Sequence, residues 1–154
     1  MPKIFHSLIM VFAISAAMLG NVSAQTRDLA MEESNRKLVV DFYNQFFNQH
    51  DTVKAAESVA ENYLPHNPLL PDGKKAFVDF FNGFFQGNPD AKAQIIRSGT
   101  DGDLVFLHVH FKVNTSDRGQ ALVDIFRVKD GKIIEHWDVM QVVPENAANT
   151  NTMF

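Results

Sequence analysis

One segment of the chain reads Val123-Asp-Ile-Phe-Arg-Val-Lys-Asp-Gly-Lys-Ile-Ile-Glu-His-Trp-Asp-Val139. On either side of Asp130-Gly131, apolar and polar residues alternate with a period close to two, which is typical of half-buried β-strands. An Asp-Gly pair between two such runs favours a type I′ turn, whose central residues both need positive φ angles. The segment therefore predicts an antiparallel hairpin with strands at 120–129 and 133–143.

Two more strands and three helices extend from this hairpin toward the N-terminus. The same alternation predicts strands at 93–98 and 104–113. Upstream of residue 87 the apolar residues recur at helical spacing instead. This part predicts an amphipathic helix at 27–49, a short helix that begins at His50-Asp51-Thr52 and runs to Tyr63, an extended Pro-rich segment at 63–73 and a Phe-rich helix at 74–86. Helices followed by an antiparallel meander indicate an α+β domain with the helices on one face of the sheet.

The first 24 residues have the features of a secretory signal peptide. Lys3 precedes an apolar run at 8–19, and small residues end the segment at Ala24. A transmembrane anchor is the alternative, but the 12 residues of the run span only about 18 Å as a helix, short of the ~30 Å of hydrocarbon. We therefore expect an exported protein, periplasmic or secreted, with cleavage after Ala24. The single domain then covers residues 25–154, with a loosely ordered C-terminal tail.

The composition excludes several classes of protein. The chain has 154 residues, a formal charge of −4, 45% hydrophobic residues and no cysteine. A mildly acidic chain lacks the dense Lys and Arg face that binds the phosphates of nucleic acids. The absence of cysteine excludes disulfides, thiolate catalysis and Cys-ligated zinc. Carboxylates and imidazoles are the candidates that remain for chemistry.

Histidines and aspartates gather on one face of the predicted sheet. Because alternate residues of a strand share a face, one face receives His108, His110, Asp124, His136 and Asp138, interleaved with apolar residues. One interpretation puts this face in water. Exposed strand positions favour Lys, Glu, Thr and Ser, however, whereas His and Asp among Phe, Leu and Met suit a hydrophobic pocket with a few polar groups. We therefore expect a curved sheet that wraps this face around a pocket beneath the helices, and an aliphatic outer face that is buried in a homodimer.

Four parts of the sequence resemble the SnoaL-like polyketide cyclase family, which belongs to the nuclear transport factor 2-like superfamily. They are Tyr63-Leu-Pro-His-Asn-Pro68, the segment from Gly102 to His110, the segment from Val123 to Val139 and the ending Asn149-Thr-Asn-Thr-Met-Phe154. The resemblance covers nearly the whole chain after the leader. It implies a cone-shaped α+β barrel, in which the N-terminal helices pack on a curved antiparallel sheet that encloses a cavity. It also implies no cofactor and commonly a dimer through the outer face of the sheet.

The resemblance further implies roles for individual residues. In the cyclases an aspartate on the last strand removes a proton α to a carbonyl and starts an aldol closure, and the similar position here is Asp138. Asp124, one strand earlier, matches a second polar group that assists the base or holds the enolate oxygen. The chemistry of the face itself leaves Asp124, His108 or His66 open as the oxygen-side partner. An ordinary ion pair with an arginine at the strand end is the alternative role for Asp138.

We expect the pocket to be lined by Tyr43, His66, Asn67, Phe106, His108, His110, Phe126, His136 and Met140.

A metal site is a weaker alternative. His108, His110 and His136, on one face with a carboxylate, suit zinc, iron or copper, but their spacing is not specific. We therefore expect no metal and no cofactor.

The sequence leaves two functions open. One is an exported enzyme that performs cofactor-free acid–base chemistry, an aldol-type cyclisation or an isomerisation, on a hydrophobic carbonyl compound. The other is a noncatalytic protein that holds a small apolar ligand in the same cavity. Export favours the second, because polyketide cyclases are expected beside cytoplasmic synthases. In both cases the expected partners are a small hydrophobic molecule and a second copy of the chain, without nucleic acid and, after removal of the leader, without a membrane.

Overall fold

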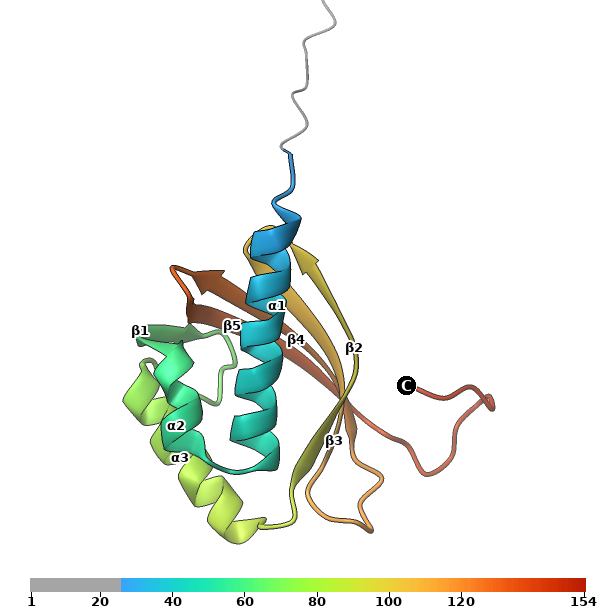
Figure 1. Cartoon of the computed structure of the whole chain (residues 1–154). Helices are drawn as coiled ribbons and strands as arrows, with labels where there is room; N and C mark the ends of the chain where they lie inside the picture. Colours follow the sequence, from blue (N-terminus) through green and yellow to red (C-terminus); the bar gives the residue numbers. More distant parts are fainter. Residues whose placement is uncertain (1–25) are drawn as a thin grey trace, which may run out of the picture.

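The computed structural model describes residues 26–154, and the predicted leader at 1–24 lies outside them. Three helices pack on one face of a five-stranded sheet that does not close on itself (Figure 1). The helical elements are α1 (Leu29–Tyr43), a π-helical turn (Asn44–Asn48), α2 (Thr52–Ala55), a 3-10 turn (Ala56–Ser58) and α3 (Lys74–Gly87). The strands are β1 (Val59–Pro65), β2 (Lys92–Asp101), β3 (Leu104–Lys112), β4 (Gln120–Lys129) and β5 (Lys132–Val142). The predicted α+β class is confirmed.

The sheet has the strand order β1-β5-β4-β3-β2. Strands β2 to β5 form the predicted antiparallel meander. Asp130 and Gly131 have φ angles of 51° and 70°, so the predicted turn between β4 and β5 is confirmed.

Strand β1 was not predicted, and it makes the sheet mixed because it runs parallel to β5. The sequence prediction extended the second helix to Tyr63, and that prediction is wrong. Val59 and Tyr63 are both buried, and a spacing of four places two residues on one side of a helix or of a strand alike. The helix ends at Ala55, and from Val59 the backbone pairs with β5 instead.

A bulge in the β4–β5 hairpin determines which side chains of β5 face the helices. Next to the turn, Val128 pairs with Ile133, whereas one step further Arg127 pairs with Glu135. Ile134 is therefore the extra residue, and the adjacent Ile133 is fully buried. The bulge also brings Asp138 opposite Asp124, where an uninterrupted register would have placed Trp137.

Aromatic packing fixes the helices above the sheet. Phe46 stacks on Phe77 of α3 with ring centroids 4.7 Å apart, and the neighbouring Phe47 also reaches α3, with its centroid 5.3 Å from that of Phe81. Both side chains come from the π-helical turn, whose wider backbone lets consecutive residues approach the same helix. The aromatic cluster thus holds α1 and α3 together over the inner face of the sheet.

A buried carboxylate ties the start of α1 to the turn between β2 and β3. Glu32 accepts hydrogen bonds from the Arg27 guanidinium, from the Thr100 hydroxyl at 2.8 Å and from the Gly102 amide at 3.3 Å. The Arg27 hydrogen bond, followed by that from Thr100, lowers the pKa of Glu32 from 4.5 to about 2. A carboxyl group with a lowered pKa in the folded state stabilises that state above its unfolded pKa, and this stabilisation disappears as the pH falls through the folded value.

Glu32→Gln should therefore flatten the acid limb of the stability curve. Between about pH 4.5 and pH 2 we expect the melting temperature of the wild type to fall more steeply than that of the variant. Thermal unfolding followed by circular dichroism across this range measures the difference. Glu61→Gln, at an exposed carboxylate, is the matched control and should follow the wild type. Parallel curves for Glu32→Gln and the wild type would contradict the assignment.

Candidate active site

A cavity of about 280 Å³ lies between the inner face of the sheet and helices α1 and α3. Most of its wall consists of Phe, Leu and Met side chains. Its polar lining groups are Tyr43, Tyr63, Asn67, Gln120, Asp124, His136 and Asp138. A small number of convergent polar groups in an apolar cavity is typical of a site for a small molecule.

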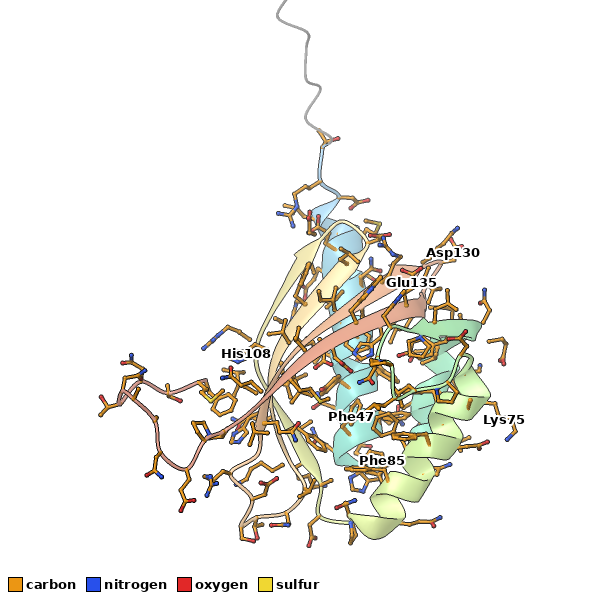
Figure 2. The ribbon with its side chains drawn as sticks, turned by 180° about the vertical axis from the view of Figure 1, so that it is seen from behind. Phe47, Lys75, Phe85, His108, Asp130 and Glu135 are labelled. Carbon is orange, nitrogen blue, oxygen red and sulfur yellow. The ribbon has the colours of Figure 1, made fainter. Side chains whose placement is uncertain are left out.

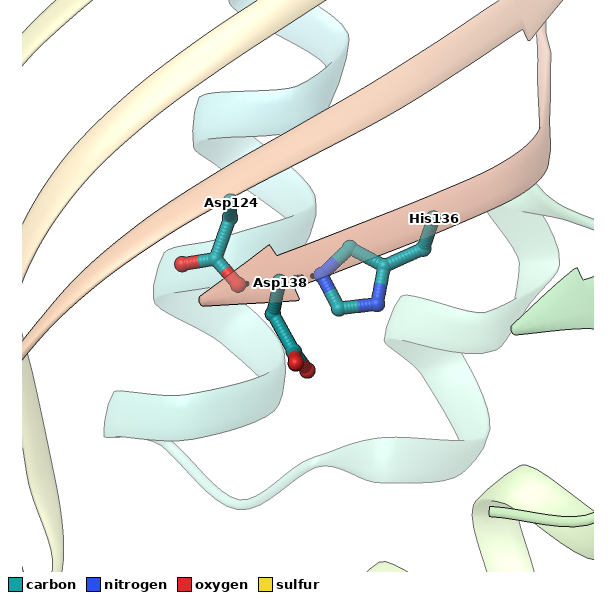
Figure 3. Close-up of side chains that lie close together, drawn as sticks. All are labelled: Asp124, His136 and Asp138. Atoms are coloured by element: carbon teal, nitrogen blue, oxygen red, sulfur yellow. Dashed lines mark hydrogen bonds and ion pairs between the residues drawn. The ribbon is translucent and has the colours of Figure 1, made fainter. Parts of the chain in front are cut away.

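Asp124, on β4, joins two other polar side chains at the base of the cavity. It is 3% exposed, and its Oδ2 accepts the Tyr43 hydroxyl at 3.0 Å. Its Oδ1 lies 2.9 Å from Nε2 of His136. Figure 3 shows the two side chains directed toward each other. A carboxylate between a phenol and an imidazole is satisfied when both donate, which assigns the ring hydrogen of His136 to Nε2. Asp124 therefore orients Tyr43 and His136 rather than acting as a free acid.

The hydroxyl of Tyr43 keeps its proton. Burial raises its pKa well above 10, and the negative charge of Asp124 and the hydrogen bond to it raise it further. Tyr43 is thus a permanent donor to Asp124.

Asp138, on β5, is held differently and remains accessible. Its two carboxylate oxygens accept the amide group of Asn67 at 3.0 and 2.8 Å. The Asn67 side-chain oxygen in turn accepts the backbone amide of Leu69 at 2.9 Å, which fixes the orientation of the amide group. Asp138 is only partly buried and borders the cavity. A carboxylate with a fixed orientation and free lone pairs at an apolar cavity is suited to accept a proton from carbon.

Several predicted site residues do converge on this cavity. The structure brings together in its wall Tyr43, Asn67, Asp124, Phe126, His136, Asp138 and Met140. The paired positions Asp124 and Asp138 place both carboxylates on one face of adjacent strands.

The predicted position of three residues of β3 is wrong. Cross-strand partners share a face, and Leu107 pairs with Asp124, so Phe106, His108 and His110 point to the opposite side. Figure 2 shows His108 on the side of the sheet away from Phe47 and Phe85. The inward face of β3 is aliphatic instead.

His66 does not line the cavity either. Its ring is exposed and stacks on Trp137, with centroids 4.4 Å apart and planes 4° from parallel. This stack lies on the outer side of β5, so His66 is not the oxygen-side partner.

Sequence reasoning missed two polar residues of the wall, Tyr63 and Gln120. Tyr63 was assigned to the buried side of a helix, and recognition of β1 would have placed it beside β5. Gln120 has the same parity as Asp124 on β4, so the alternation that found Asp124 also contained it.

One group of residues could hold a divalent cation. Asp124, His136 and Asp138 each offer a ligand atom, and these atoms lie within 4.8 Å of one another. The hydrogen bonds from Tyr43 and Asn67 already engage both carboxylates, which favours proton transfer over metal binding. The three-histidine metal site considered from the sequence is wrong, because His108 and His110 lie on the other face.

Comparison with known proteins places the chain within the α+β folds related to nuclear transport factor 2. The family model of the SnoaL-like polyketide cyclases matches residues 37–147, and the chain belongs to this family. No match was found among curated protein sequences.

Solved structures with this fold are similar to the chain at low sequence identity. A proposed ketosteroid isomerase from Kribbella flavida is 19% identical, with a TM-score of 0.62 over 77% of this chain and 85% of that one. A proposed polyketide cyclase from Bacillus cereus is 23% identical, with a TM-score of 0.61 over 75% and 82%. A SnoaL-like protein of unknown function from Burkholderia thailandensis is 13% identical, with a TM-score of 0.62 over 71% and 97%. These similarities support the fold.

Proposed function

We propose that this SnoaL-like protein catalyses cofactor-free acid–base chemistry on a small hydrophobic carbonyl compound, leading to an aldol-type cyclisation or an isomerisation. The observation that carries the proposal is the carboxylate of Asp138, which Asn67 fixes at the edge of an aromatic cavity. The names of the similar structures and of the family agree with this class of reaction.

The reaction starts at the carbon next to the carbonyl. Asp138 takes the proton as the C–H bond breaks, and the electron pair moves onto the carbonyl oxygen as an enolate. In a cyclisation the enolate carbon then attacks a second carbonyl, and Asp138 returns the proton to the new alkoxide. In an isomerisation Asp138 returns it to a different carbon. The wall is mostly apolar, and electrostatic interactions are stronger in surroundings of low polarity than in water.

Exchange of α-hydrogens for deuterium tests the proposal without knowledge of the natural substrate. 2-Tetralone, a bicyclic apolar ketone, is incubated with the protein in D₂O, and its α-proton signals are followed by NMR. We expect the protein to accelerate their loss with saturation kinetics. Saturable binding of 2-tetralone without accelerated exchange would contradict catalysis and support the noncatalytic binding protein.

We also propose that the chain is exported and cleaved after Ala24, on the basis of the apolar run at 8–19. Within residues 26–154 no helix is long and apolar enough to cross a membrane. Expression of the full chain in a Gram-negative host should yield periplasmic protein whose intact mass corresponds to a start at Gln25. A full-length mass would contradict this proposal.

Exposed apolar residues on the outer face of the sheet support the proposal that the chain forms a homodimer through this face. Val123 and Val139 pair across β4 and β5 and are 43% and 67% exposed. The C-terminal tail lies on this side of the sheet (Figure 1), and Phe154 stacks on His110 with centroids 4.0 Å apart. Exposed valines next to a partly covered apolar surface are typical of an interface between protein chains.

Val139→Asp should therefore convert a dimer into a monomer. A carboxylate at this position would lie unpaired in the interface, which is costly to desolvate. Sedimentation velocity measures the change, and Val53→Asp is the matched control, because Val53 is 71% exposed but belongs to α2. A monomeric wild type, or a Val139→Asp protein that stays dimeric, would contradict the proposed interface.

A further inference from the structure

One polar side chain of the cavity wall lies apart from the two carboxylates. Asp124 and Asp138 are cross-strand partners and lie side by side on β4 and β5. Gln120 is on the same strand and the same face as Asp124, four residues earlier, and it also lines the cavity. At ~3.3 Å per residue this separation is about 13 Å along the strand. The cavity therefore carries polar groups at two well-separated points of its wall.

The neighbours of Gln120 in the wall are apolar. Its cross-strand partner on β3 is Phe111, which shares its face and lines the cavity as well. The ring centroid of Phe111 lies 6.0 Å from that of Phe84 on α3, and Val113 is a further lining residue. Gln120 thus presents an amide beside two phenylalanines and a valine.

The amide group of Gln120 is available to a ligand. Its side chain forms no hydrogen bond within residues 26–154, whereas the amide group of Asn67 is held by Asp138. Gln120 is half-buried, so water can reach its amide in the free protein. A ligand that fills this part of the cavity displaces that water, and covering an amide without replacing its hydrogen bonds is costly. The site therefore favours a ligand with a hydrogen-bonding group at this point over the same ligand without one.

We propose that Gln120 is a specificity-determining residue that hydrogen-bonds a hydroxyl or carbonyl group at the far end of the substrate. This inference rests on the proposed function, because it places the reacting ketone at Asp138. The substrate is then an elongated hydrophobic molecule with a polar group at each end, and it has at least two rings, because one ring is too short to span four strand residues. Gln120 contacts no reacting atom, so it contributes equally to the binding of substrate and transition state.

Two ketones that differ in one hydroxyl test the assignment by binding alone. 4-(4-Hydroxyphenyl)cyclohexanone carries a ketone and a hydroxyl at opposite ends of two linked rings, and 4-phenylcyclohexanone lacks the hydroxyl. Titration calorimetry should show that the wild type binds the hydroxylated ketone about fivefold more tightly, as one neutral hydrogen bond would provide. Gln120→Leu keeps the size of the side chain and should abolish this preference, with little change in the affinity for 4-phenylcyclohexanone. A wild type without the preference, or a preference that survives in Gln120→Leu, would overturn the inference.

Two controls test the position of the amide. Gln141 pairs with Ala121 on the outer face of the sheet and is exposed, so Gln141→Leu makes the same substitution outside the cavity and should keep the preference. 6-Hydroxy-2-tetralone carries its hydroxyl closer to the ketone, on fused rings, and is too short to reach Gln120. Its affinity relative to 2-tetralone should therefore be the same in the wild type and in Gln120→Leu, and a difference would contradict the inferred span.

Deuterium exchange of the two cyclohexanones separates this inference from the proposed function. In the wild type the hydroxyl should lower KM about fivefold and leave kcat unchanged, and Gln120→Leu should abolish the difference in KM. Accelerated exchange with a KM difference that survives in Gln120→Leu would overturn the inference and leave the proposed function standing. If the wild type fails to accelerate exchange but its binding preference depends on Gln120, catalysis is refuted and the assignment of Gln120 stands.

Discussion

Asp138→Asn should slow the exchange of 2-tetralone α-protons by about 100-fold or more, within the range that general bases contribute. The substitution keeps the size and planarity of the side chain but removes its basicity. KM should change little, because the apolar wall that holds the bicyclic ring is untouched. NMR measurement of initial exchange rates over a range of ketone concentrations separates kcat from KM.

A carboxylate on the same strand provides the control for Asp138→Asn. Glu135 lies three residues earlier on β5 and forms an ion pair with Arg127 at 2.9 Å, outside the cavity. Glu135→Gln removes the same charge from β5 and should retain the wild-type exchange rate. If Asp138→Asn also retained it, the base would have to be another group, and the proposed role of Asp138 would be refuted.

The β4–β5 hairpin was predictable from the sequence because residues that are adjacent in the chain determine its turn. Asp130 and Gly131 adopt positive φ angles that few other residue pairs tolerate, so the turn follows from two adjacent residues. The bulge at Ile134 was not predictable in this way. Asp124 and Asp138 were correctly placed on one face because both are polar residues among apolar ones. A two-residue turn without a bulge would instead have paired Asp124 with Trp137.

Strand β1 and the orientation of β3 depend on contacts that are distant in sequence. Val59 and Tyr63 fit a helix or a strand equally well, and only pairing with β5 selects the strand. Alternation divides β3 into two sets of residues, but it does not indicate which set faces the helices. Pairing of Leu107 with Asp124 selects the aliphatic set, which buries more apolar area than the histidine set would.

The same distinction explains which parts of the candidate site were found from sequence. Asp124, His136 and Asp138 were identified because polar residues at inward positions of strands are conspicuous. Tyr63 was overlooked because a tyrosine among apolar residues is usually part of the core.

Asp124→Ala should be the most destabilising substitution in the site, with a loss of about 2–5 kcal/mol in the free energy of unfolding, because each buried group left unpaired costs about 1–3 kcal/mol. The carboxylate accepts two hydrogen bonds from groups that are themselves buried, Tyr43 and His136. Removal of this acceptor leaves a phenol and an imidazole N–H unpaired in an apolar environment, and such unsatisfied groups incur their full desolvation cost.

Asp124→Asn separates the effect of charge from the effect of hydrogen bonding. Its amide oxygen can still accept one hydrogen bond, and the Tyr43 hydroxyl can rotate to accept one from the amide group. We therefore expect a smaller loss, about 1–3 kcal/mol. Urea unfolding followed by the fluorescence of Trp137, which is the single tryptophan of the chain, measures both variants.

The exposed carboxylate of Asp79 provides the matched control for Asp124. It pairs with Lys75 one turn earlier on α3, and both side chains are more than half exposed. Asp79→Ala should change the unfolding free energy by no more than about 0.5 kcal/mol. If Asp124→Ala cost no more than Asp79→Ala, the contacts with Tyr43 and His136 would not stabilise the fold. The proposed role of Asp124, which is to support the cavity and to orient those two side chains, would then be refuted.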